Sequence, residues 1–232
     1  YAALDVACLP TIYQHQKSAL KESGRLGWLE EECALLITQY SEELKGDYSD
    51  YYLSFKGAWQ LKSEELAVLQ LLAQWRELRA RKRDKPRNWI VKDKQLLEIA
   101  KLRPSSLEDL KHIDDLGRHF LHHEGDEVLG VVKQALEISA DLLPISLPKP
   151  LEGNEKQQLK NGQQFAEQKA LELGLPTEML IRKRWLISLL QNMRNLSKED
   201  LEQNTDTVEF LPVELAGWRK PLLIPELMEA ME

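Results

Sequence analysis

Two residues at the start of this 232-residue chain, Tyr1 and Asp5, have types and spacing that could do chemistry. A spacing of four places both side chains on one face of a helix. There a carboxylate can hold a divalent cation while a phenol orients the attacking water, which is the chemistry of metal-assisted hydrolysis. The same pair also fits an ordinary helix with a buried tyrosine and an exposed aspartate, because Tyr-x-x-x-Asp occurs by chance in many helices.

A second feature is a basic segment over residues 76–103, in a chain whose net charge is −7. It holds eleven basic residues and four acidic ones, so it carries +7 while the rest of the chain carries −14. The basic residues are Arg76, Arg79, Arg81, Lys82, Arg83, Lys85, Arg87, Lys92, Lys94, Lys101 and Arg103. A basic island on an acidic molecule predicts a phosphate footprint on one face. Ordinary charge clustering at a solvated helix end explains the charges equally well.

The elements that position these residues are predicted to be helices, because strand alternation is absent apart from short runs such as Trp89-Ile90-Val91. We therefore expect an all-α fold. The expected helices cover residues 1–20, 28–44, 63–83, 126–140 and 155–173, with shorter ones beginning near Asp93 and at Ser105. Ser63 is the predicted N-cap of the long helix, and Leu78 belongs to its predicted inner stripe. Glu108, three residues after Ser105, predicts a capping box.

The chain divides at a proline-rich stretch and then repeats its pattern. Three prolines within residues 143–150 predict an extended linker. Aligning Pro86 with Pro176 then matches a helix, a proline, a basic cluster and a second helix in the same order. The matched pairs are Trp75 with Phe165, Val91 with Ile181, Lys92 with Arg182, Lys94 with Arg184 and Leu96 with Leu186. A period near 90 residues is too long for a solenoid unit, so we interpret it as a duplicated small helical domain.

Bulk properties limit the class of protein. No apolar run approaches the roughly 18 residues that a membrane span needs. The chain has no Met at position 1 and no signal-peptide pattern, so we expect it to begin inside a longer protein. Cys8 and Cys33 lack metal-ligand spacing and suggest thiols in a reducing cytoplasm.

Several segments together resemble the ribonuclease D family. The segments are Tyr1-Ala2-Ala3-Leu4-Asp5-Val6, Gly24-Arg25-Leu26, Trp28-Leu29-Glu30-Glu31-Glu32-Cys33, Phe55-Lys56-Gly57-Ala58-Trp59-Gln60-Leu61, Trp75-Arg76, Pro86-Arg87-Asn88-Trp89 and Lys92-Asp93. The first three are similar to the end of that family's exonuclease domain, and the others to its first helicase-and-RNase-D C-terminal (HRDC) domain. The second half resembles a second, more divergent HRDC domain.

The resemblance implies a 3′→5′ exoribonuclease of the DEDD type, in the subgroup that uses tyrosine. Such enzymes trim the 3′ ends of transfer RNA precursors and other stable RNAs with two divalent metal ions, Mg²⁺ or Mn²⁺. Asp5 matches the last metal-binding acid and Tyr1 the phenol that orients water. The other acids of the family lie in motifs that have no counterpart here, so we expect the chain by itself not to cleave RNA.

The same resemblance implies four segments: the end of the exonuclease domain with a linker over 1–56, a first HRDC domain over 57–141, a proline-rich linker over 142–153, and a second HRDC-like domain over 154–232. HRDC domains are helical bundles that bind or position nucleic acid. The implied partner is RNA with a free 3′ end, with neither a membrane nor an obligate protein partner. The candidate phosphate contacts are Arg83, Lys85, Arg87, Lys92 and Lys94, because phosphate contacts orient the polymer without reading its sequence.

Trp89 lies inside the basic segment, and two interpretations of it stay open. Its ring could stack on a base, as in proteins that bind single strands, or it could pack between helices, which is the default expectation. Two further functions also stay open for the chain as a whole. One is the nucleic-acid-binding HRDC module of a RecQ-type helicase, which would need neither Tyr1 nor Asp5. The other is a helical interaction scaffold with no role in nucleic-acid binding.

Overall fold

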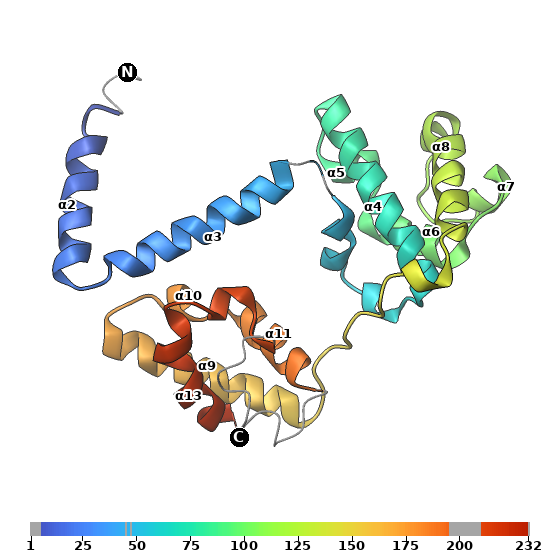
Figure 1. Cartoon of the computed structure of the whole chain (residues 1–232). Coiled ribbons are helices and arrows are strands. Elements are labelled where there is room, and N and C mark those ends of the chain that lie inside the picture. The colour runs from blue at the N-terminus through green and yellow to red at the C-terminus, as the bar shows by residue number, and fades with distance from the viewer. Residues whose placement is uncertain (1–5, 45, 47, 195–209, 232) are drawn as a thin grey trace. The chain divides into compact units, whose positions relative to one another are not determined.

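The computed structural model describes residues 6–44, 46, 48–194 and 210–231 (Figure 1). Its regular elements are all helices, and none of the described residues forms a strand, which confirms the all-α prediction. The chain forms two compact units, and they do not simply follow one another along the sequence. One unit contains residues 42–149, whereas the other joins residues 1–41 to residues 150–232. None of the described helices is long and apolar enough to cross a bilayer.

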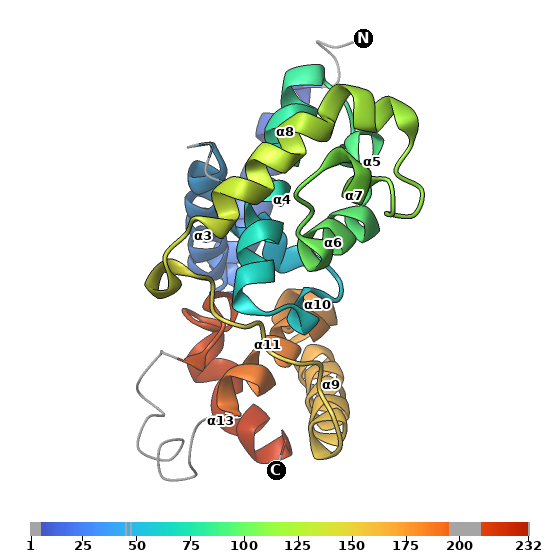
Figure 2. The same cartoon turned by 90° about the vertical axis from the view of Figure 1, so that its right-hand side faces the viewer.

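The unit formed by residues 42–149 is a bundle around one long helix, α4 (Ser63–Arg83). Helix α4 packs against α8 (Arg118–Leu136), α6 (Asp93–Leu102), the short helix α5 (Arg87–Ile90) and the 3-10 helix η1 (Ser49–Ser54) (Figure 2). The remaining elements are η2 (Ala58–Gln60), α7 (Leu107–Leu110) and η3 (Ala140–Leu142). The core of the bundle contains the fully buried leucines Leu66, Leu69 and Leu72 of α4, together with Leu96 of α6.

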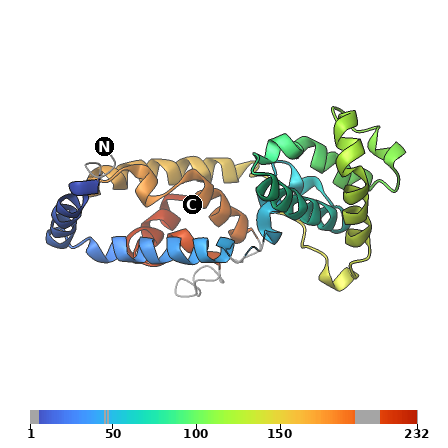
Figure 3. The ribbon, with the colours of Figure 1, turned by 90° about the horizontal axis from the view of Figure 1, so that it is seen from above.

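The other unit combines α2 (Leu9–Glu22) and α3 (Leu26–Leu44) with a second bundle. That bundle consists of α9 (Asn154–Leu173), α10 (Thr177–Leu180), α11 (Lys183–Met193), η5 (Val213–Leu215) and α13 (Arg219–Met231). Helix α9 packs against α13, α11 and α10, and Figure 3 shows α3 running alongside this bundle. Leu186, Leu189 and Leu223 are fully buried in its core, whereas α2 buries none of its residues.

The two bundles repeat the same local structure at an interval of 90 residues. Helix α10 begins 90 residues after α5, and α11 begins 90 residues after α6. The last residues of α4 and α9 have the same spacing, and each helix ends at a residue in the left-handed conformation, Asp84 or Gly174. The matched residues Val91 and Ile181 are both 3% exposed. These coincidences of length, cap and burial support the predicted duplication.

Some local predictions were wrong. Helix α4 takes Lys62 as its N-cap instead of Ser63, because the Glu65 carboxylate accepts the Lys62 N–H at 2.9 Å. Leu78 is 51% exposed, since the core lies against other faces of α4. The capping box lies one residue later than expected. There the Asp109 carboxylate accepts the Ser106 N–H at 3.0 Å, and the Ser106 hydroxyl oxygen accepts the Asp109 N–H at 3.2 Å.

Two longer segments can also be compared with prediction. The helix expected over 126–140 covers Arg118–Leu136 instead. Gly125 does not break it, because this glycine is buried inside α8 where it packs closely against Leu107. The proline-rich stretch was predicted correctly, since no helix forms between Leu142 and Asn154. The predicted domain boundaries at 56, 141 and 153 stay predictions.

Candidate nucleic-acid interface

The predicted catalytic pair, Tyr1 and Asp5, lies outside the described residues. Within the part of the chain that the structure describes, no group of three or more His, Cys, Asp or Glu side chains could hold a metal ion. The described residues therefore do not form a two-metal site. The site that can be built from them is the basic surface at the end of α4 and around α5, which contains the five predicted phosphate contacts.

The arginines of this surface are tied to buried carboxylates. Arg83 forms an ion pair with Glu124 of α8, whose side chain is only 3% exposed. Arg79 reaches the same carboxylate at 2.8 Å. A charge held against a buried acid is already compensated, and its removal would leave that acid less well compensated. Arg83 therefore joins α4 to α8. This pairing makes it a weaker candidate for phosphate binding than the sequence indicated.

A second buried acid, Glu77, compensates two more arginines. Its carboxylate lies 2.7 Å from Nε of Arg81 and 3.0 Å from Nε of Arg87, while its side chain is 6% exposed. The hydrogen bond to Glu77 raises the pKa of Arg81. Arg87 also covers the ring of Tyr51, with 5.0 Å between the guanidinium carbon and the ring centroid. These contacts fix the orientation of Arg87 at the start of α5.

The lysines of the basic surface are more available than its arginines. Among the described residues, Lys85 and Lys92 form no ion pair, and both are exposed. Lys94 lies 3.6 Å from Glu98 and 3.9 Å from Asp114, and its side chain is 66% exposed. Such long, exposed pairs contribute little and exchange readily with other ligands. Lys85, Lys92 and Lys94 are thus less engaged by carboxylates of the described residues than Arg83 and Arg87 are.

A shallow pocket of about 390 Å³ lies at the turn between α4 and α5. It is lined by Glu77, Ala80, Arg81, Asp84, Lys85, Pro86 and Arg87. Three of these side chains are cationic and two are anionic, so the pocket has a modest positive charge. Glu77 and Ala80 are buried, and the other five lining residues are exposed.

Trp89 contradicts the default interpretation that it packs between helices. Its side chain is 75% exposed, although the next residue, Ile90, is 9% exposed and belongs to the core. Sequence pattern missed this arrangement, because Trp89-Ile90-Val91 is a continuous apolar run that does not show which residue faces outwards. The exposed ring therefore faces solvent at a position between Arg87 and Lys92 in the sequence.

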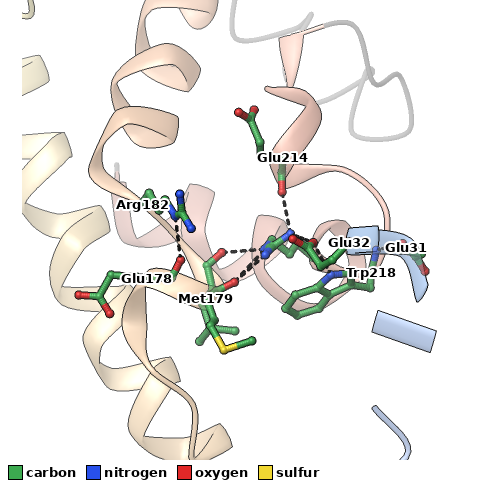
Figure 4. Close-up of polar contacts among 9 residues, drawn as sticks. Glu31, Glu32, Glu178, Met179, Arg182, Glu214 and Trp218 are labelled. Atoms are coloured by element: carbon green, nitrogen blue, oxygen red, sulfur yellow. Dashed lines mark hydrogen bonds and ion pairs between the residues drawn. The ribbon is translucent and has the colours of Figure 1, made fainter. Parts of the chain in front are cut away.

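The second unit has its own polar cluster, which ties α3 to the second bundle (Figure 4). The side chain of Arg219 is 4% exposed and forms an ion pair with Glu32 of α3. Arg219 also donates to the carbonyl oxygens of Met179 at 2.6 Å, Leu180 at 3.0 Å and Glu214 at 3.1 Å. These carbonyls belong to α10 and η5, so one guanidinium joins four elements.

Aromatic stacking extends this contact along α3. Trp28 stacks on Trp218 with ring centroids 4.4 Å apart and planes inclined by 11°. Trp218 donates from its indole Nε1 to Glu32 at 3.0 Å, and its backbone N–H donates to Glu31 at 2.8 Å. Burial opposes ionisation of Glu32, but the hydrogen bonds from Arg219 and Trp218 outweigh it, so the pKa of Glu32 lies below its ordinary value. None of these contacts was predicted from sequence, because they join residues more than 180 positions apart.

The bundle built around α4 belongs to a known class of small helical domain. Residues 65–132 match the family model of the HRDC domain, and this match lies inside the unit built around α4. The chain also has relatives over its full length. It is 31% identical over 232 residues to ribonuclease D of Pseudomonas paraeruginosa, covering 100% of this chain and 58% of the relative. It is 30% identical over 236 residues to ribonuclease D of Serratia proteamaculans, covering 100% of this chain and 59% of that one.

A solved structure agrees with these relatives. The crystal structure of Escherichia coli RNase D matches with a TM-score of 0.75 and 26% identity, over 100% of this chain and 59% of that one. That protein is described as an exoribonuclease involved in structured RNA processing. The chain is thus similar to ribonuclease D along its whole length and contains an HRDC domain. It spans somewhat under three fifths of the length of these relatives.

Proposed function

We propose that the chain belongs to a 3′→5′ exoribonuclease of the ribonuclease D type, which trims the 3′ ends of transfer RNA precursors and other stable RNAs in the cytoplasm. The observation that carries this proposal is the similarity to ribonuclease D over all 232 residues. A RecQ-type helicase module explains less, because the similarity continues well beyond the HRDC match at residues 65–132.

The proposed chemistry uses two divalent ions, Mg²⁺ or Mn²⁺, which when bound would activate water and stabilise the leaving oxygen. Asp5 is proposed as one of their ligands and Tyr1 as the group that orients water. Support for both assignments comes from the resemblance of residues 1–6 to the family, since the described residues supply no metal cluster. The catalytic test is trimming of 5′-labelled RNA by the intact gene product with Mg²⁺. We expect shortening from a free 3′ end only, and loss of shortening on Asp5→Asn.

The basic surface at the end of α4 and around α5 is proposed to hold and orient the RNA through phosphate contacts. Lys85, Lys92 and Lys94 support this role, because they are exposed and leave the buried acids undisturbed. Arg83 and Arg87 are proposed as secondary contacts, since each is already paired with a carboxylate. Phosphate binding of this kind releases counterions, which makes affinity fall with salt.

The test of RNA binding reverses these three lysines together. The variant with Lys85→Glu, Lys92→Glu and Lys94→Glu should bind single-stranded RNA more weakly. The slope of log affinity against log salt concentration should become shallower by about two, because each single-strand phosphate contact contributes about 0.7 to that slope. The matched control is Lys21→Glu with Lys156→Glu and Lys160→Glu, which changes the net charge equally at exposed lysines of the other unit. Equal losses in the two variants would show a general charge effect and remove the basic surface from the proposal.

A further inference from the structure

Trp89 differs in its exposure from every other tryptophan of the chain. All six tryptophans lie among the described residues. Trp75, Trp185 and Trp218 are at most 8% exposed, and Trp28 and Trp59 are partly buried. Trp89 is 75% exposed. An exposed apolar side chain is common on protein surfaces, so its exposure alone assigns no function.

The ring is mounted on a rigid support. Its helix α5 follows Pro86 and is closed by the hydrogen bond from the Trp89 N–H to the Pro86 carbonyl, at 2.9 Å. The next two residues, Ile90 and Val91, are in the core of the bundle. Arg76 of α4, which is 4% exposed, donates to the Val91 carbonyl at 3.1 Å and so holds the end of α5. A ring on such a mount loses little backbone freedom when it binds a ligand.

Cations stand on both sides of the ring along the chain. Lys85 and Arg87 precede it by four and two residues, and Lys92 follows it by three. All three are exposed. A flat exposed aromatic side chain between cations is the combination that binds single-stranded nucleic acid, because bases stack on the ring while phosphates contact the cations.

The internal repeat shows that the fold by itself does not require this arrangement. The residue 90 positions after Trp89 is Met179, which occupies the same place in α10 and is 52% exposed. Its flanking positions that match Lys85 and Arg87 are Leu175 and Thr177, which are neutral. Only the position after it that matches Lys92, Arg182, is cationic. Among the described residues, an exposed ring with cations on both sides in the sequence is therefore found in the first bundle and not at the matching place in the second.

We propose that Trp89 is a stacking platform for an unpaired base of single-stranded RNA, with Lys85 and Lys92 contacting the neighbouring phosphates. The inference rests on the proposed RNA-binding function and deepens it by naming the form of RNA that this surface takes. Duplex RNA does not fit, because its bases are already stacked and paired. The exposed ring thus selects single-stranded segments, such as a 3′ tail, without reading their sequence.

The test compares two RNAs and three variants of the full chain. The first RNA is a single-stranded octamer of adenylate. The second is a blunt-ended hairpin whose short loop is held closed by a crosslink. Trp89→Ala should weaken binding of the octamer by about five- to hundredfold, which is the usual range for one stacked base. Trp89→Phe should restore most of the affinity, because it keeps an aromatic face. Met179→Ala, the matched control in the second bundle, should bind the octamer like the unaltered chain. The affinity for the hairpin should be the same in all variants.

Fluorescence supplies a second readout that a structural effect would not produce. Saturating octamer should quench tryptophan emission of the unaltered chain, and this quenching should disappear in Trp89→Phe although the variant still binds. The slope of affinity against salt should be unchanged in Trp89→Ala, since no phosphate contact is lost.

The outcomes separate this inference from the proposed function. Unchanged octamer affinity in Trp89→Ala would overturn the stacking inference, and so would an equal loss on the hairpin. If the triple-lysine variant loses affinity while Trp89→Ala does not, only the stacking inference fails. If the unaltered chain binds neither RNA at low salt, the proposed RNA-binding function fails together with it.

Discussion

The contact between α3 and the second bundle allows a quantitative prediction for Glu32→Ala. The Glu32 carboxylate accepts two charge-assisted hydrogen bonds, from Arg219 and from Trp218. Each bond of this kind contributes about 1.5–3 kcal/mol when it is buried. The side chain of Glu32 is 34% exposed, so water replaces part of what is lost and the lower end of the range applies. We therefore expect Glu32→Ala to weaken the docking of α3 by about 3 kcal/mol.

Hydrogen exchange measures this loss directly, because it reports the opening of single helices. A loss of about 3 kcal/mol should speed exchange of the α3 amides by roughly 150-fold, since about 1.4 kcal/mol corresponds to a factor of ten. Amides of α4 and α6, in the other unit, should be unaffected. The control is Glu30→Ala, an exposed neighbour on α3 for which no side-chain contact is described. Equal exchange of α3 in Glu32→Ala and Glu30→Ala, or a joint loss of protection in both units, would show that Glu32 does not hold α3 against the bundle.

Further predictions concern the pH dependence of the Glu32 contact, the residues in left-handed conformation and the buried carboxylate of Glu124. The folded-state pKa of Glu32 is lowered, so its stabilisation of α3 is complete above about pH 4.5 and is lost as pH falls through that lower pKa. Hydrogen exchange of the α3 amides, followed from pH 6 to 3, should show this loss. Glu32→Gln should remove most of the response. Gly217→Ala should cost about 1–2 kcal/mol in thermal unfolding, because Gly217 has φ of 58° and an added Cβ would meet the Glu31 carboxylate. Gly174→Ala should cost about 1 kcal/mol at the left-handed end of α9, whereas Asp84→Gly at the matching end of α4 should be nearly neutral; urea titrations that disagree with this order would show that the two caps are not equivalent. Glu124→Ala should cost about 3 kcal/mol, because it leaves Arg79 and Arg83 without their shared buried partner, and protection of α8 should fall far more than in the exposed control Glu127→Ala.

The sequence by itself determined the helices and their repetition. Helical spacing and breakers act over a few residues, so Pro86, Gly174 and the proline-rich stretch marked where helices end and where the pattern begins again. These breakers allowed Pro86 to be aligned with Pro176, and in the structure α5 and α10 begin at the same interval of 90 residues. The basic segment was also visible at once, because a count of charges needs no coordinates.

Tertiary structure alone decided which of these charges are available and which residues they meet. Arg83 and Glu124 are 41 positions apart, and Glu32 meets Arg219 across 187 positions. No local pattern predicts such pairs, since they depend on how helices pack. The exposure of Trp89 has the same origin: in a run of three apolar residues, only the packing of α5 on α4 determines that Ile90 and Val91 turn inwards while Trp89 faces solvent. Helical periodicity therefore determined the elements, and long-range packing determined the surface that they present.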